Sequence, residues 1–226
     1  MTTDEVILHV LPPSCNSGVI RTFLLAADIP FKEENAWGKT RTPDFIAKFP
    51  NNCCPALEHG DYSIAECSAI LRYLCKAFPD KAGKYYSDDA KVAGKIDMIC
   101  DMVNTSVCVL IVKACYPTVS FPCGPGDVAG IDETKEHTSK AQEAAGAALK
   151  EYLENKIVGI FLDKTKYLGS DTPTIADFRF APLLSLIKVN QTLPERLEEY
   201  LKAMDEIPGF SEGRKPYDEF NSKHWK

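Results

Sequence analysis

The sequence predicts an α/β domain followed by an all-helical domain. Strand and helix patterns alternate over about the first eighty residues, and no convincing strand pattern follows residue 88. A segment with Pro79, Gly83 and several charges separates the two parts. Alternating strands and helices build a sheet covered by helices, whereas successive helical patterns build a helical bundle. We therefore expect domains at residues 1–78 and 88–226, joined by a linker at 79–87.

The first domain is expected to begin with a strand at residues 6–11. These residues, VILHVL, are nearly continuously apolar, which is typical of a strand buried on both faces. Apolar residues at helical spacing then predict a helix from about Ser17. Residues 30–32 begin a second short strand, and Thr42-Pro43 is typical of the N-cap and first turn of another helix.

A β-hairpin and a further helix complete this domain. Residues 55–58 and 62–64 flank a Gly60-Asp61 turn, which predicts the hairpin, and a helix with an apolar side opens at Glu66. The order strand–helix–strand–helix–strand–strand–helix predicts a mixed four-stranded sheet with helices on both faces.

The second domain shows only helical patterns. They run over residues 89–117, 131–157, 174–190 and 194–205, and the Pro- and Gly-rich segment at 117–130 is expected to be a loop.

Composition limits the class of partner. The formal charge is −6 and the pI is near 5.3, which argues against nucleic acid, because phosphate binding needs clustered Lys and Arg. The longest apolar candidate, residues 103–114, is interrupted by polar residues and is shorter than the roughly 20 residues that span a bilayer. The acidic first residues are unlike a secretory signal. We expect a cytosolic protein that binds neither nucleic acid nor membrane.

The nine cysteines suggest free thiols. Their number is odd, and they form no CxxC pair and no cluster with histidine, so they fit neither a disulfide framework nor a zinc site. We expect buried or incidental thiols in a reducing compartment and no metal.

Two motifs resemble those of one family. The run PALEHGDYSIAECSAILRYL, from Pro55, resembles the glutathione-binding stretch of cytosolic glutathione transferases, roughly V-P-x-L-x-D/G-x-x-x-x-E-S-x-A-I-x-x-Y-L, and T-I-A-D from Thr174 resembles their S/T-x-A-D box. Residues 11–17, LPPSCNS, are most similar to the serine-using delta and theta groups. The resemblance covers nearly the whole chain. It implies a thioredoxin-like domain that binds glutathione and a helical domain that binds a hydrophobic electrophile.

The resemblance makes Ser14 the candidate catalytic residue. A free thiol with a pKa near 8.5 is only about 3% ionised at pH 7, and lowering this pKa by roughly two units, about 2.7 kcal/mol, makes the thiolate the major species. A hydroxyl that donates to the glutathione sulfur near a helix N-terminus can stabilise the thiolate by a free energy of this size. Alternatively, Ser14 only caps the helix.

Cys15 is the competing candidate. It lies where thioredoxin relatives carry a redox cysteine, and a reactive thiol there would form a mixed disulfide with glutathione, as in omega-like members. The vicinal pair Cys53-Cys54 is expected to serve packing and backbone presentation.

The resemblance also implies how the tripeptide is held. A cis Pro55 would turn the Cys54 backbone outward to pair with the cysteinyl part of glutathione. Glu66 and Cys67 would bind the γ-glutamyl carboxylate at a helix N-terminus. Cys67 replaces the usual serine, and a thiol is a weaker donor. Asn52 would contact the glycyl carboxylate.

A homodimer is implied as well, and Asp101 would reach the glutathione amino group of the neighbouring subunit. Lys39 and Arg41 are further possible carboxylate partners, and Thr174 with Asp177 is interpreted as a structural capping box. The electrophile pocket is expected near residues 106–116, 117–130 and 210–225.

Two other functions stay open. One is another enzyme on the same fold, either a glutathione-dependent thiol oxidoreductase or an isomerase, using Cys15. The other is a non-catalytic ligand-binding or structural dimer, because a fold does not determine a function. A hydroxyl at Ser14 argues against the first, and the presence of Glu66 and Asp101 argues against the second.

Overall fold

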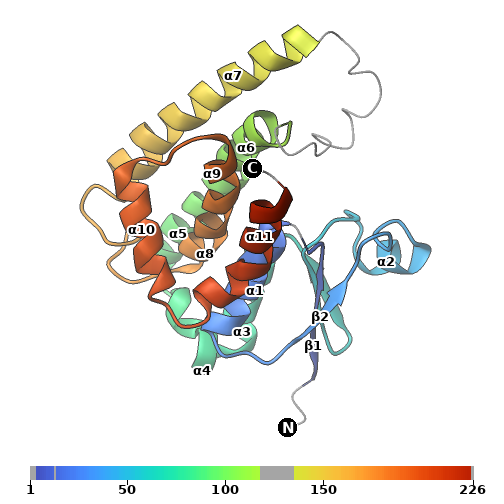
Figure 1. Ribbon diagram of the computed structural model, residues 1–226. Helices are drawn as coiled ribbons and strands as arrows, with labels where there is room; N and C mark the ends of the chain where they lie inside the picture. Colours follow the sequence, from blue (N-terminus) through green and yellow to red (C-terminus); the bar gives the residue numbers. More distant parts are fainter. Residues whose placement is uncertain (1–3, 13, 118–134, 225–226) are drawn as a thin grey trace.

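The computed structural model describes residues 4–12, 14–117 and 135–224 (Figure 1). Its first part is a four-stranded sheet in the order β2-β1-β3-β4. β1 pairs with β2 in parallel and with β3 in antiparallel orientation, and β3 and β4 form an antiparallel hairpin. The elements are β1 (Val6–Val10), α1 (Cys15–Ala26), β2 (Lys32–Asn35), α2 (Pro43–Lys48), β3 (Ala56–His59), β4 (Tyr62–Ala65) and α3 (Cys67–Ala77).

Both faces of β1 are covered, as its apolar sequence predicts. Leu8 and its alternate neighbours pack in the main core with α1 and α3. The ring of His9, on the opposite face, makes edge contacts with Phe45 and Phe49 of the α2 region. The two faces thus place α1 and α3 toward the helical domain and α2 away from it (Figure 1).

The remaining described elements are helical. They are α4 (Pro79–Ala82), η1 (Gly83–Tyr85), α5 (Ala90–Met102), η2 (Val103–Val107), α6 (Cys108–Cys115), α7 (Lys135–Tyr152), η3 (Leu153–Phe161), α8 (Ile175–Phe180), η4 (Ala181–Leu183), α9 (Leu184–Asn190), α10 (Glu195–Asp205) and α11 (Phe210–His224). The fold predicted from the sequence, a thioredoxin-like domain followed by a helical domain, is confirmed.

Several segments differ in detail from the sequence prediction. The segment expected as a linker holds α4 and η1. The pattern at 174–190 folds as three short helices instead of one, with Pro182 in the middle piece. Residues 118–134 are outside the described residues, so the expected loop at 117–130 lies almost entirely beyond the description.

The run Ala90–Cys115 is one helical stretch of 26 residues with a π-helical segment in its middle. By length and composition it could cross a membrane, a test that the core helix of a soluble protein also passes. Ile99, Val103 and Val107 on this run are buried in the main core. Packing between helices therefore accounts for these residues, whereas Val92, Met98 and Val109 on the same run are exposed.

Helix α11 is the longest element that sequence patterns missed. It contains Gly213 and Pro216, which normally interrupt helices. A Cβ at Gly213 would lie 2.6 Å from the backbone of Thr22 on α1, so glycine allows the two helices to pack closely. The side chain of Arg21 donates to the Gly213 carbonyl at 3.3 Å. These contacts hold α11 beside α1, next to the site described below (Figure 1).

Candidate active site

A cavity of about 380 Å³ lies where the two domains meet. The N-terminal ends of α1 and α3 form one wall, and side chains of the helical domain form the other. It is lined by Leu11, Ser14, Cys15, Asn16, Thr40, Asn52, Cys53, Cys54, Pro55, Glu66, Cys67, Asn104, Tyr116, Arg179, Leu186 and Tyr217. Six of the seven predicted site residues therefore line one cavity, and the exception is Asp101.

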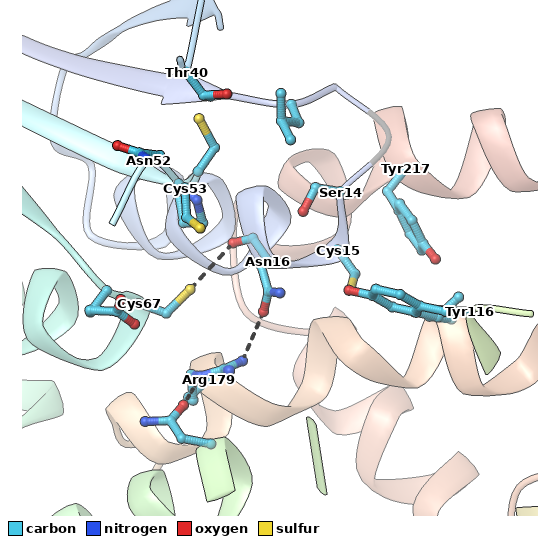
Figure 2. Close-up of a pocket in the computed structure, with 16 residues that line it drawn as sticks. Ser14, Cys15, Asn16, Thr40, Asn52, Cys53, Cys67, Tyr116, Arg179 and Tyr217 are labelled. Carbon is cyan, nitrogen blue, oxygen red and sulfur yellow. Dashed lines mark hydrogen bonds between the residues drawn. The ribbon is translucent and has the colours of Figure 1, made fainter. Parts of the chain in front are cut away.

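Ser14 is the N-cap of α1, which begins at Cys15, two residues before the predicted start. Its backbone is extended, and its Oγ accepts a hydrogen bond from the Ser17 amide at 3.4 Å. The amide uses one lone pair of the hydroxyl oxygen, and the O–H remains available to donate into the cavity. Figure 2 shows the Ser14 hydroxyl at the start of the helix, beside the cavity. Ser14 can thus cap α1 and donate to a ligand at the same time.

Cys15 is buried inside the first turn of α1. Burial raises the pKa of its thiol to about 12, with the neighbouring Cys108 adding to the effect and Arg179 opposing it. A thiol with this pKa is almost entirely protonated at neutral pH, so it is a poor nucleophile. Its environment is therefore that of a packed side chain.

The Cys54–Pro55 peptide bond is cis, as predicted. Neither the amide nor the carbonyl of Cys54 has a hydrogen-bond partner among the residues that the structure describes. Cys54 and Pro55 both line the cavity. An extended peptide in the cavity could pair with this backbone as a strand pairs with a sheet edge.

The N-terminus of α3 is open toward the cavity. Its N-cap, Glu66, has a positive φ of 73° and makes no side-chain cap hydrogen bond. The Glu66 carboxylate accepts instead from the Asn51 amide at 2.6 Å. The first amides of α3 are therefore available to an anion, which the helix dipole also favours.

Cys67 is the first residue of α3 and is buried. Its Sγ donates to the backbone carbonyl of Asn16 at 3.7 Å. Burial raises the pKa of this thiol to about 11, and Arg179 is the strongest opposing influence. The side chain thus bridges the first turns of α1 and α3, and its thiol donates within the protein (Figure 2).

Asn52 and Asp101 lie in contrasting positions. Asn52 is exposed at the cavity edge, with a left-handed φ of 53° that asparagine tolerates. Asp101 lies on α5 outside the cavity, 69% exposed, with one oxygen 3.8 Å from an Arg72 nitrogen. Lys39 and Arg41 do not line the cavity, although Thr40 between them does.

Asn16 and Arg179 line the cavity although no sequence pattern predicted them as site residues. Arg179 lies two residues after Asp177 of the T-I-A-D box, inside an apolar run. An arginine on a helix that is otherwise buried is the signal that could have found it, because such charges need a partner. Tyr116, Leu186 and Tyr217 of the helical domain also line the cavity, and both tyrosines fall within segments expected to line an electrophile pocket.

No group of His, Cys, Asp or Glu residues within the described ranges could hold a metal ion. All eight cysteines there are free thiols, and Cys123 lies outside the description.

Comparison with known proteins relates this architecture to one group. The family described as "Glutathione S-transferase, N-terminal domain" matches residues 8–82. Similar curated proteins are glutathione S-transferase F10 of Arabidopsis thaliana, 26% identical over 64% of this chain, and glutathione S-transferase D7 of Anopheles gambiae, 28% identical over 65%. The matches span 62% and 66% of the length of these two relatives.

Solved structures show the same fold over nearly the whole chain. Human glutathione-S-transferase T1-1 in its apo form superposes with a TM-score of 0.77 at 19% identity, over 95% of this chain and 90% of that one. The theta-class glutathione S-transferase from Xanthomonas axonopodis pv. citri, with glutathione bound, has a TM-score of 0.76 at 18% identity, over 93% and 97%.

Proposed function

We propose that the protein conjugates glutathione to small hydrophobic electrophiles, because residues 8–82 match the glutathione S-transferase N-terminal domain and the chain has the fold of solved glutathione S-transferases. One observation supports this most strongly. Ser14, the free backbone of Cys54 and the open N-terminus of α3 all line the same cavity at the domain junction. Glutathione is bound in the similar structure from Xanthomonas, which supports it as the co-substrate here.

In the proposed complex, glutathione lies along the wall formed by the first domain. The Cys54 amide and carbonyl pair with its cysteinyl residue next to Pro55. The amides of Glu66 and Cys67 receive the γ-glutamyl carboxylate. Asn52 donates to the glycyl carboxylate at the cavity edge.

Ser14 is the proposed catalytic residue. In this arrangement its O–H donates to the glutathione sulfur while its oxygen continues to accept from the Ser17 amide. The hydroxyl and the nearby start of α1 stabilise the thiolate, so that more of the bound glutathione is ionised at neutral pH. The thiolate then attacks an electrophile held against Tyr116, Leu186 and Tyr217.

Cys15 lines the same cavity, which keeps a glutathione-dependent oxidoreductase or isomerase as the rival proposal. Its burial and raised pKa favour the Ser14 mechanism. A non-catalytic, ligand-binding role is the other rival.

We further propose a cytosolic homodimer that detoxifies its electrophiles and needs no metal. Asp101 is exposed on α5, which leaves it available to a second subunit. Sedimentation should give twice the chain mass at micromolar concentration, and a monomer would remove Asp101 from the site.

The deciding experiment pairs two assays on the purified protein. One follows conjugation of glutathione to a chromogenic aryl halide, and the other follows reduction of a disulfide by glutathione. We expect conjugation without disulfide reduction. Reduction alone would favour the Cys15 oxidoreductase, and neither activity together with glutathione binding would favour the non-catalytic role.

A further inference from the structure

Arg179 is a buried cation without an acidic partner among the described residues. It lies on α8, is only 5% exposed, and lines the cavity. Its Nε donates to Asn104 Oδ1 at 2.8 Å, its Nη1 to Asn16 Oδ1 at 3.2 Å, and its Nη2 to Cys108 Sγ at 2.9 Å. All three acceptors are amide or thiol groups, so no carboxylate in the described chain neutralises the guanidinium.

A buried charge of this kind costs several kcal/mol unless an opposite charge compensates it. The N-terminal ends of α1 and α3 add positive potential at the same cavity. Among the described residues, Glu66 is the only carboxylate that lines the cavity, and it is exposed and hydrogen-bonded to Asn51. The part of the cavity near Arg179 and the N-terminal ends of α1 and α3 is therefore suited to a negatively charged atom of a ligand.

Asn16 lines the cavity and accepts a hydrogen bond from Arg179. It is in the first turn of α1, two residues after Ser14, and its side chain points from the helix toward Arg179 (Figure 2). An arginine has only donors, so its contact requires the oxygen of the Asn16 carboxamide to face it. The Nδ2 group of Asn16 then faces away from Arg179 and has no hydrogen-bond partner among the described residues. Because Asn16 and Ser14 line the same cavity, this nitrogen is a second donor there that has no described partner.

We propose that Asn16 Nδ2 is a second hydrogen-bond donor to the glutathione thiolate, and that Arg179 is the positioning residue that orients Asn16 and balances the sulfur's negative charge. This inference rests on the proposed function. On binding, the glutathione S–H loses its proton to solvent, and the sulfur keeps the electron pair with which it later attacks the electrophile. The Ser14 hydroxyl, Asn16 Nδ2 and the nearby Arg179 cation then stabilise the thiolate together.

The other titratable groups around this point come from every neighbouring element. Cys15 lies on α1, and Glu66 and Cys67 lie at the start of α3. Cys108 is the first residue of α6, Tyr116 follows the end of that helix, and Tyr217 lies on α11. Burial raises the pKa of the Cys67 thiol at the cavity wall, and the nearby Arg179 charge is the strongest influence that opposes this rise. It opposes the raised pKa of Cys15 as well.

The test measures the pKa of bound glutathione, from the ultraviolet absorbance of the thiolate, and the pH profile of conjugation. Asn16→Ala removes the donor, so conjugation at neutral pH should fall about tenfold and the bound thiol should need a higher pH to ionise. Asn16→Asp should lose more activity, because a carboxylate has no donor and repels the thiolate. The same variant should keep or increase stability to urea, because the new carboxylate pairs with Arg179.

Two further variants make the result specific. Arg179→Lys keeps a charge but loses the fixed donor geometry, so an intermediate loss, about threefold, is expected. Asn155→Asp adds the same negative charge at an exposed position in the helical domain, and conjugation should be unchanged. If Arg179→Lys does not fold, the two Asn16 variants still decide the question.

The possible outcomes separate the two proposals. A wild-type protein that conjugates glutathione, with Asn16→Ala and Asn16→Asp leaving the bound pKa and the pH profile unchanged, overturns this inference alone. A wild-type protein that binds glutathione as a thiol and does not conjugate it overturns the proposed function and this inference together. A raised bound pKa in both Asn16 variants, with stability retained in Asn16→Asp, supports the inference.

Discussion

Helices α8 and α3 begin in opposite ways. At α8, Thr174 and Asp177 form a capping box, as the sequence predicted. The Asp177 carboxylate accepts from the Thr174 amide at 2.7 Å, the Leu168 amide at 2.8 Å and the Tyr200 hydroxyl at 3.1 Å. Asp177 is fully buried, so the start of α8 is satisfied entirely within the protein.

At α3, the N-cap Glu66 makes no side-chain cap bond and lies at the cavity. The same backbone groups that Asp177 and Thr174 satisfy at α8 are left for a ligand at α3. The comparison teaches that a satisfied helix start contributes to stability, whereas an open one contributes to binding. α1 lies between these extremes, because Ser14 caps it with one lone pair and keeps its O–H free. Substitutions at the three helix starts should therefore affect different measurements.

The largest effect is expected at α8. Asp177→Ala leaves several buried donors without an acceptor, so the free energy of unfolding should fall by about 3–5 kcal/mol. Equilibrium unfolding in urea measures this change. Asp171→Ala, at an exposed position in the preceding loop, is the matched control and should cost less than about 0.5 kcal/mol. A loss below about 1 kcal/mol for Asp177→Ala would contradict the structural role.

The next effect is at α1. Ser14→Ala should lower conjugation at neutral pH by one to two orders of magnitude, about 1.4–2.7 kcal/mol in activation free energy, because the bound thiol loses a donor. Raising the pH should restore part of the rate, since more glutathione then ionises without help. Affinity for glutathione should change little.

Three further variants separate the capping role of Ser14 from its role as a donor and test Cys15 as the alternative. Ser14→Thr keeps both the cap and the hydroxyl and should retain most activity. Ser14→Asp keeps the cap but has no O–H to donate when ionised, so it should be stable and inactive. Cys15→Ala should leave conjugation nearly intact. An inactive Cys15→Ala beside a tolerant Ser14→Ala, with a glutathione adduct on the wild-type protein, would assign the chemistry to Cys15.

A smaller effect is expected at α3, and on binding alone. The family resemblance also implies that the Glu66 carboxylate contacts the bound peptide, so Glu66→Gln should weaken glutathione binding about tenfold, or about 1.4 kcal/mol. Unfolding in urea should be unaffected, since the side chain is exposed. Titration calorimetry compares it with Asp61→Asn, an exposed acid in the adjacent hairpin turn, whose affinity should equal that of the wild type. Equal affinity for Glu66→Gln would remove Glu66 from the binding site.

The smallest effect is at Cys67. A hydroxyl is a better donor than a thiol, so Cys67→Ser should increase glutathione affinity by about two- to fivefold. The matched control is Cys75→Ser on the same helix, buried away from the cavity, which should lose stability without any change in affinity. Weaker binding by Cys67→Ser would mean that the thiol's contact with the Asn16 carbonyl matters more than a donor to the ligand.

Local signals in the sequence determined much of this protein. The Gly60-Asp61 turn predicted the hairpin, Thr42 the start of α2, and Thr174 with Asp177 the start of α8. The turn and the two helix caps each depend on groups within a few residues of one another, so a short stretch of sequence is enough to predict them. The resemblances around Ser14 and Pro55 then pointed to six residues that share one cavity, although their roles remain predictions.

Only the tertiary structure decided the rest. α11 forms despite Gly213 and Pro216 because Gly213 packs against Thr22, almost two hundred residues earlier in the chain. Asn16 and Arg179 are separated by a similar distance in sequence, and neither predicts the other locally. The orientation of the Asn16 carboxamide depends on its contact with Arg179 of α8. This contact forms only when the two domains pack against each other. Contacts of this kind arise from the whole core, so no local pattern encodes them.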